Sequence, residues 1–127
     1  MILALTFDYG QRAAGQEKRA SQKIAKHYNV PHLVLSLDWL KKITKTALVD
    51  RKQKLPLLRS SAVGSRRTAQ KVWVPNRNGV FLNIAAAYAD SLGAEVILTG
   101  FNVEEAQTFP DNSLAFCIAA DKFFGYS

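Results

Sequence analysis

Cysteine and histidine are scarce in this chain, and their scarcity limits the disulfide and metal chemistry that it can carry. The 127 residues include one cysteine, Cys117, and two histidines, His27 and His32. A single cysteine cannot form an internal disulfide or a cysteine-cluster zinc site within one chain, and it suits the reducing cytosol. We therefore expect no structural zinc, no disulfide framework and a cytoplasmic protein.

Long hydrophobic runs are also missing. No stretch of about 18 uncharged apolar residues occurs, which argues against a membrane-spanning helix. The apolar N-terminal run MILALTF lacks a basic leader and soon reaches Asp8, so it favours a strand over a signal peptide. Apolar residues make up 48% and charged residues 21% of the chain, which is typical of globular domains. We expect one domain over residues 1–127, without membrane contact.

Acidic residues are few where the basic ones gather. The net charge is +7, and residues 41–71 hold ten Lys/Arg against one acid, Asp50, so this segment is +9 and the remainder −2. Such a segment is typical of an anion site that binds nucleic acid, nucleotide phosphates or an acidic partner. The absence of a ladder of aromatic residues favours the alternative, a solvated loop. Residues 44–72 follow neither helical nor strand period, which predicts a mobile basic loop.

The spacing of the apolar residues predicts an α/β fold. Short apolar runs indicate strands, and runs with a helical period indicate helices. The expected strands are 2–7, 32–37 and 95–100, and the expected helices are 12–28, 38–43, 78–92 and 111–124. This order predicts a parallel sheet with helices on both faces. The residues of the first helix that are expected to face the core are Ala13, Ala20, Ile24 and Tyr28.

Candidate binding residues follow the first and third expected strands. Ligands of open α/β sheets bind at the carboxyl ends of the strands, and the first strand here runs into Asp8-Tyr9-Gly10-Gln11. Gly10 permits close approach of a ligand to the backbone, and Asp8 suits a hydroxyl, a metal or a helix cap. The third strand runs into Gly100 and Asn102, with Glu105 close behind, where an amide and carboxylates suit a base-like ligand or Mg²⁺.

A second candidate lies at the start of the helix 78–92. Arg77 lies directly before this helix, where a guanidinium suits bidentate binding of a carboxylate or phosphate. Asn78 is the expected N-cap residue. The alternative is that Arg77 ties down the preceding loop, and the residue types alone do not separate the two interpretations.

Three stretches taken together resemble one known family. LALTFDYGQR, VPNRNGVFLNIAAAYADSLGAEVILTGFNVEE and FPDNSLAFCIAADKF are similar to the 7-cyano-7-deazaguanine synthase family of queuosine and archaeosine biosynthesis. The resemblance covers Leu3 to about Phe124. It implies an adenine-nucleotide α-hydrolase-like fold of the PP-loop ATP pyrophosphatase type. It also implies the use of ATP, Mg²⁺ and ammonia to convert 7-carboxy-7-deazaguanine, a small-molecule substrate, to the nitrile through an adenylated acid.

The resemblance assigns site candidates position by position. The residues that match the family's motifs, and that are therefore nucleotide- or substrate-binding candidates, are Asp8, Tyr9, Gly10, Gln11, Arg77, Asn78, Gly100, Asn102, Glu105 and Asp111. The resemblance assigns no catalytic residue among them.

The chain departs from the family's pattern in two places. It contains no SGGxDS sequence, the Gly–Ser loop that cradles the ATP phosphates in the family, and no four-cysteine zinc cluster. We therefore expect a fold without the family's first strand, and no zinc. We also expect the isolated chain to be inactive, because adenylation needs donors placed around the phosphates.

Two alternatives to an enzyme stay open. One is a non-catalytic nucleotide- or RNA-binding remnant that uses the basic segment. The other, from an older description of the family, is a regulator of exopolysaccharide (succinoglycan) synthesis. In either case we expect a homodimer, because the edge of strand 2–7 and the apolar side chains of helix 111–124 are predicted to be exposed.

Overall fold

The computed structural model describes residues 3–50 and 72–126. These residues belong to two compact units. The first unit comprises residues 3–50 and 72–75, and the second comprises residues 76–126. The greater part of the predicted basic loop, residues 51–71, lies outside the described residues.

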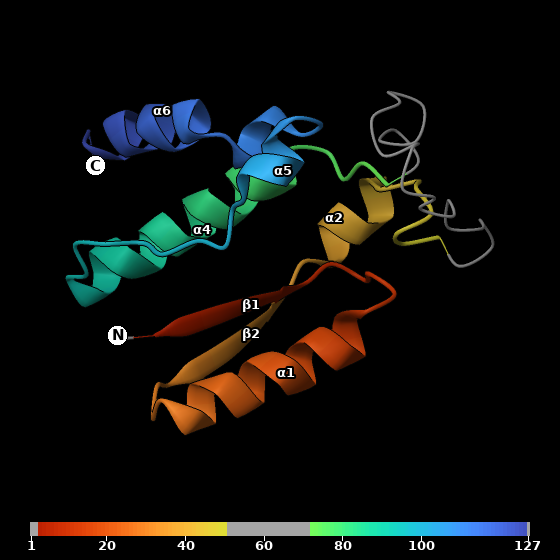
Figure 1. The fold of residues 1–127 in the computed structure, drawn as a ribbon. Helices are drawn as coiled ribbons and strands as arrows, with labels where there is room; N and C mark the ends of the chain where they lie inside the picture. The colour runs from red at the N-terminus through yellow and green to blue at the C-terminus, as the bar shows by residue number, and fades with distance from the viewer. Residues whose placement is uncertain (1–2, 51–71, 127) are drawn as a thin grey trace. The chain divides into compact units, whose positions relative to one another are not determined.

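The first unit is built on a β-α-β element, as the apolar pattern predicts. Strand β1 (Ala4–Asp8) is followed by helix α1 (Ala14–His27) and strand β2 (His32–Ser36) (Figure 1). The two strands pair in parallel, residue for residue, over their full length of five residues. Helix α1 packs against both strands. The turn after β1 lies at the carboxyl end of the sheet, because it directly follows the last residue of the strand.

Helix α1 presents a different face to the strands from the one predicted. Its less exposed positions are Ala14, Lys18, Ser21 and Ala25, of which Ala25 is buried. The predicted core residues Ile24 and Tyr28 are 59% and 70% exposed, so that prediction is wrong. The small side chains on the inner face allow the helix to approach the strands closely, and Lys18 on the same face forms an ion pair with Asp8 of β1.

Helix α2 (Asp38–Ile43) completes the first unit and supplies its most buried side chain. Leu40 is completely buried, and the other buried apolar residues of this unit are Tyr9, Ala25, Leu37, Ala47 and Val74. Residues 44–50 continue from α2 with hydrogen bonds of their own: the amide of Arg12 donates to the carbonyl of Leu48 over 3.0 Å, and the Arg12 side chain donates to the carbonyl of Asp50. This segment is therefore tied to the turn after β1.

The second unit is helical. It contains α4 (Arg77–Leu92), α5 (Val103–Ala106), the 3₁₀ turn η1 (Pro110–Asn112) and α6 (Leu114–Phe124). Helix α4 confirms the predicted helix and ends at Gly93, whose φ of 63° is the left-handed conformation that glycine adopts without strain. Helices α4, α5 and α6 all contact η1, so this short turn joins the unit together.

The strand predicted at 95–100 is not formed. The sheet of the described residues has two strands, β1 and β2. A strand is held by hydrogen bonds to a neighbouring strand, and no backbone group of residues 95–100 has a hydrogen-bond partner among residues 3–50 and 72–126. The prediction of a three-stranded sheet is therefore wrong for the described chain, although the α/β class with a parallel sheet is confirmed.

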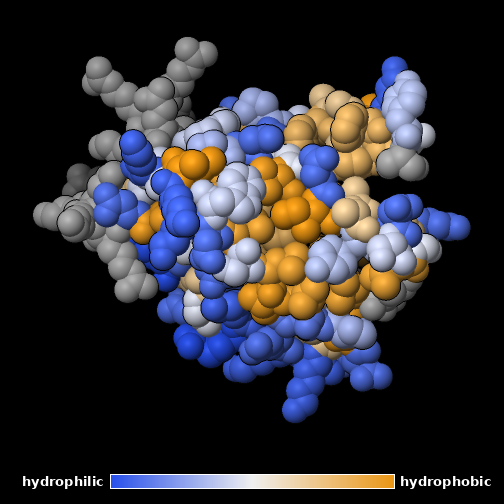
Figure 2. All heavy atoms as spheres, turned by 180° about the vertical axis from the view of Figure 1, so that it is seen from behind, coloured by the Kyte–Doolittle hydropathy of each residue, from blue (hydrophilic) through white to orange (hydrophobic). Residues whose placement is uncertain are grey.

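Many apolar side chains lie at the surface. Figure 2 shows exposed apolar side chains among polar ones. In the second unit, the large apolar residues that are at least 60% exposed are Val96, Leu98, Val103, Leu114, Ile118, Phe123 and Tyr126. None of the helices in the described ranges combines the length and the apolar character needed to cross a bilayer.

Candidate functional site

The turn after β1 depends on a glycine in the left-handed conformation. Gly10 has φ = 78°, which side chains other than glycine rarely adopt. The side chain of Lys41 lies directly over it: a Cβ atom built on Gly10 would come within 2.5 Å of the Lys41 Cδ atom. The glycine therefore serves both the sharp turn and the close approach of a lysine from α2.

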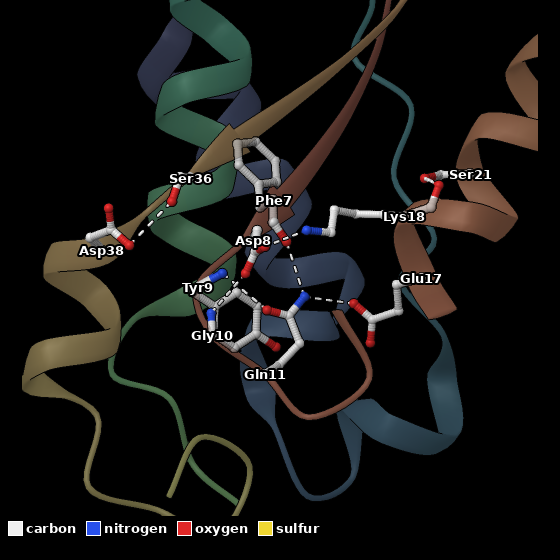
Figure 3. A network of polar contacts seen from close by, with 10 residues as sticks. All are labelled: Phe7, Asp8, Tyr9, Gly10, Gln11, Glu17, Lys18, Ser21, Ser36 and Asp38. Carbon is white, nitrogen blue, oxygen red and sulfur yellow. Dashed lines mark hydrogen bonds and ion pairs between the residues drawn. The ribbon is translucent and has the colours of Figure 1, made fainter. Parts of the chain in front are cut away.

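Asp8 is the charged centre of this turn. Its Oδ1 accepts a hydrogen bond from the Gly10 amide over 3.0 Å, and its Oδ2 forms an ion pair with Lys18 Nζ at 2.8 Å (Figure 3). The hydrogen bond from Lys18 is the main cause that lowers the pKa of Asp8 below 3.8, followed by the Gly10 amide. Asp8 therefore carries its negative charge at neutral pH, with Lys18 and Lys41 beside it.

Gln11 is buried and uses its side chain inside the turn. Its Oε1 accepts from the Tyr9 amide over 3.0 Å, while its Nε2 donates to the Phe7 carbonyl and to Glu17 Oε2, over 3.0 and 2.7 Å. Only 4% of Gln11 is exposed. The structure thus gives Gln11 the role of holding the turn, with Glu17 of α1 as its anchor (Figure 3).

The start of α4 is organised by Asn78, although not as the predicted cap. The residue before the helix is Asn76, which has φ = 46° and makes no side-chain capping bond. Asn78 is the second residue of the helix and is buried; its Nδ2 donates to the carbonyl of Asp111 over 3.1 Å. The N-cap prediction is wrong because the helix begins at Arg77, before Asn78, and the Asn78 side-chain oxygen that a cap would use accepts from Arg77 Nε instead.

Arg77 and Asp111 flank this bond. Arg77 Nε donates to Asn78 Oδ1 over 3.2 Å, and the terminal guanidinium nitrogens have no partner among the described residues. Asp111 takes part through its carbonyl. The neighbouring Asn112 is 7% exposed, and its Nδ2 atom is buried without a hydrogen-bond partner, which is an uncommon state for a buried amide.

The remaining candidates surround helix α5. Asn102 caps this helix: its Oδ1 accepts from the Glu105 amide over 2.7 Å. The side chains of Asn102 and Glu105 are exposed, and Gly100 has no atom within 4 Å of where a Cβ would stand. Helix α5 contacts η1, as α4 does, so Asn102, Glu105, Asn78 and Asp111 belong to elements that meet at η1.

The ten predicted site residues therefore fall into two groups. Those in the turn after β1 belong to the first unit, and those around α4, α5 and η1 belong to the second. Residue-by-residue inspection of the sequence missed the partners of these groups, namely Glu17, Lys18, Lys41 and Asn112. Lys18 and Glu17 carried a detectable signal, since both lie in the first turns of the helix that follows Asp8 and Gln11; Lys41 and Asn112 are recognised only once the fold is known.

No metal ligands are assigned. Within the parts of the chain that the structure describes, no three His, Cys, Asp or Glu side chains gather closely enough to hold a metal ion. At the start of α4, a guanidinium with unused nitrogens and a helix start without a side-chain cap suit an anion.

A parallel β-α-β unit with a charged glycine turn, together with an Arg–Asn pair at a helix start, defines an α/β protein with candidate binding groups at loop and helix ends. The chain belongs to the family described as queuosine biosynthesis protein QueC, whose family model matches residues 1–127.

Curated relatives agree with this family. The 7-cyano-7-deazaguanine synthase of Bdellovibrio bacteriovorus is 53% identical over 133 residues, which cover 100% of this chain and 57% of the relative. The synthase of Carboxydothermus hydrogenoformans is 52% identical and 60% covered, and that of Methanosarcina mazei is 46% identical and 57% covered. The chain thus spans less than two thirds of the length of these relatives. No solved structure matches it significantly.

Proposed function

We propose that these 127 residues supply part of the binding site of a 7-cyano-7-deazaguanine synthase. The proposed reaction is the conversion of 7-carboxy-7-deazaguanine to the nitrile with ATP and ammonia, and Mg²⁺ accompanies ATP. The observation that carries the proposal is the match of the whole chain, at 53% identity, to a protein of that name. The ten candidate residues named above are proposed to bind the nucleotide or the substrate.

The start of α4 supports an anionic ligand. Arg77 has unused guanidinium nitrogens, and the first amides of α4 lack a side-chain cap. Both groups are donors, and the positive end of a helix dipole favours a carboxylate or a phosphate. A carboxylated base and a nucleotide triphosphate both offer such groups, so the donor set fits the proposed substrates.

The proposed fold is that of the PP-loop ATP pyrophosphatases without the first strand. Because these residues contain no SGGxDS sequence and a single cysteine, we expect neither a phosphate loop nor a zinc site within them. The isolated chain is therefore expected to form no nitrile, since the donors that stabilise charge in adenylation are incomplete.

A chimera tests the function. The matched segment of the B. bacteriovorus synthase is replaced by residues 1–127, and nitrile formation is measured with ATP and ammonia. We expect activity within about 10-fold of the parent, and a loss of at least about 100-fold when Arg77→Lys removes bidentate binding. Asn83→Asp, on the exposed side of the same helix, is the matched control and is expected to leave activity unchanged. An inactive chimera that is folded would contradict the proposal.

A second candidate, binding of a nucleotide or RNA phosphate, has support from the charge distribution. Residues 3–50 and 72–75 hold eight Lys/Arg and four Asp/Glu, whereas residues 76–126 hold two and six. The basic segment 41–71 begins within the first of these groups, at residues 41–50. If it binds RNA, the affinity falls steeply with salt, by about 10³-fold or more between 50 and 200 mM for six phosphate contacts. Affinity that does not respond to salt would exclude this candidate.

The proposal extends to location and assembly. Deazaguanine chemistry on free ATP suits the cytoplasm, and the exposed apolar residues of α6 suit a homodimer.

A further inference from the structure

The outer face of α1 carries a row of basic side chains. At 3.6 residues per turn, Arg19, Lys23 and Lys26 fall within about 60° of one another around the helix axis. The side of the helix that packs against the strands, with Lys18 and Ala25, lies opposite to them. We call Arg19, Lys23 and Lys26 the α1 ridge, and all three residues are exposed.

The α1 ridge has no acidic partner within the described parts of the chain. Its three side chains form neither an ion pair nor a hydrogen bond with any described residue. The acids closest to α1 are engaged elsewhere. Asp8 pairs with Lys18 on the inner face of the helix. The carboxylate of Glu17 accepts from Gln11 in the turn after β1. The positive charge of the ridge is therefore left to the solvent or to a ligand.

The stability of the helix does not explain this arrangement. Arg19 and Lys23 are four residues apart, Lys23 and Lys26 are three apart, and like charges at these spacings destabilise a helix. The helix dipole favours cations in the last turn, which includes Lys26 and His27. Arg19 and Lys23 precede that turn, so the dipole does not offset their repulsion. A bound polyanion would supply the opposite charge that the ridge lacks.

The shape and composition of the ridge favour a nucleic acid over other anions. The ridge extends about 10 Å along the outside of a helix, whereas small ligands bind in concave sites. A helix that lies on a membrane inserts an apolar face, but the side of α1 opposite the ridge packs against the strands. Lysine is depleted at protein–protein interfaces, while lysine and arginine are the residues that neutralise nucleic-acid phosphates.

We propose that the α1 ridge binds the phosphate backbone of a nucleic-acid duplex. A row of cations fits the regular phosphates of a duplex, and the ridge includes no aromatic side chain on which single-stranded bases would stack. Contacts to phosphates carry no sequence information, so the binding is independent of base sequence. RNA and DNA share this chemistry. The inference does not depend on the proposed synthase function, and the ridge is separate in sequence from the basic segment 41–71.

Fluorescence anisotropy with short labelled duplexes tests the proposal on the full chain. An RNA duplex, a DNA duplex and a single strand are compared, and tighter binding of one duplex identifies the nucleic acid. Because the ridge offers three phosphate contacts, a plot of log K against log salt is expected to have a slope of about −2.7 or steeper. Polyglutamate, a polyanion without phosphates, is expected to compete weakly.

Neutralising the ridge tests where the duplex binds. The variant Arg19→Gln/Lys23→Gln/Lys26→Gln removes three charges and keeps polar side chains of similar length. We expect it to weaken binding by at least about 10-fold near 50 mM salt and to reduce the steepness of the salt plot by about 2–3. Urea unfolding checks that the variant is folded.

A control variant with the same net charge separates the ridge from the charge of the whole chain. Asn83→Asp/Ala87→Glu/Ser91→Glu also lowers the net charge by three, at exposed positions of α4. We expect its affinity for the duplex to stay within about 3-fold of the wild type, because charges distant from the ridge are screened by salt. Its folding is checked in the same way.

Several results would overturn the inference. A wild-type chain that binds neither duplex near 50 mM salt would exclude the site. A ridge variant that binds as tightly as the wild type would place the binding on other cations, such as those of segment 41–71. Equal weakening by both variants would show that only net charge matters. Tighter binding of the single strand, or equal competition by polyglutamate, would contradict the choice of a duplex. Nitrile formation is not a readout here, so failure of the proposed function leaves this result unaffected.

Discussion

Lys18 Nζ lies 2.8 Å from Asp8 Oδ2, which joins the inner face of α1 to the last residue of β1. The pair lies beside the Gly10 amide, which donates to the other carboxylate oxygen of Asp8. Because Asp8 is held from both sides, the carboxylate is oriented before any ligand arrives. The contact therefore connects the side of α1 that faces the strands with the turn of the candidate site (Figure 3).

Replacing Asp8 with asparagine is expected to reduce stability in a pH-dependent way. The pKa of Asp8 is lowered below 3.8 in the folded chain by Lys18 and the Gly10 amide. A carboxyl with a lowered folded pKa stabilises the fold above its unfolded pKa, and this stabilisation is lost as pH falls through the folded value. At pH 7 we expect Asp8→Asn to lower the free energy of unfolding by at most about 1 kcal/mol, because both side chains are partly exposed and screened.

Urea unfolding of both proteins from pH 7 to pH 2 checks this expectation. The difference between them should hold above the ordinary pKa of an aspartate and be lost as pH falls through the lowered pKa of Asp8. Glu95→Gln, at an exposed carboxylate without a hydrogen bond, is the control and should change stability by less than about 0.5 kcal/mol. A difference that is independent of pH would show that the ion pair is not its source.

Two glycine-to-alanine changes are expected to act in opposite directions. Gly10→Ala places a side chain at φ = 78° and against Lys41, so we expect a loss of about 1–2 kcal/mol from the backbone conformation alone. Gly15→Ala lies in α1 with only the end of Arg19 within 4.0 Å of the new Cβ, and alanine favours the helix by up to about 1 kcal/mol. Thermal or urea unfolding of both variants measures these changes in stability. Equal effects of the same sign would contradict the prediction.

The local elements were predictable, because their signals are contained in neighbouring residues. The apolar runs that became β1 and β2, the helical period of α4 and the glycine at its end each act over a few positions. The short helix at 38–43 was predicted with the bounds that the structure has.

The misses all involve partners that are distant in sequence. The rotation of α1 brings Lys18 to Asp8, ten positions away, and leaves the large side chains of Ile24 and Tyr28 exposed. Asn78 was expected to cap its own helix, but its amide reaches Asp111 instead. Residues 95–100 have the composition of a strand, yet pairing requires a neighbour, which no local pattern reveals. For the candidate site, the sequence identified Asp8 and Gln11 as candidates. It did not show that the Gln11 side chain forms hydrogen bonds within the turn.

The same substitution at two asparagines of α4 is expected to have unequal effects. Asn78→Asp removes a donor from a buried bond to the Asp111 carbonyl and adds a buried charge, so we expect a loss of about 1–3 kcal/mol. Asn83 Nδ2 also donates to a carbonyl, that of Gly79 over 2.8 Å, but it is exposed, and water replaces this bond. Asn83→Asp should therefore cost less than about 0.5 kcal/mol. Urea unfolding that shows the same loss for both would contradict the role given to Asn78.

The last prediction concerns self-association through α6. Leu114 and Ile118 are four residues apart on this helix and are 76% and 60% exposed, and Phe123 is 62% exposed. Apolar side chains gathered in this way are rarely left in water, and a symmetric dimer is the commonest way to cover them. We therefore expect the chain to sediment at micromolar concentration with twice its mass of 14.1 kDa.

A pair of isoleucine variants locates this dimer. Ile118→Lys is expected to raise the dissociation constant by at least about 10-fold, because a charge would be buried in an apolar contact. Ile24→Lys is the matched control: Ile24 is 59% exposed on α1, but Lys23 and Lys26 lie beside it, and this basic face is not expected to associate. Sedimentation velocity of the three proteins over a range of concentrations decides between the outcomes. A wild-type chain that stays at 14.1 kDa would exclude the dimer, and equal weakening by both variants would show that net charge, rather than the face of α6, controls association.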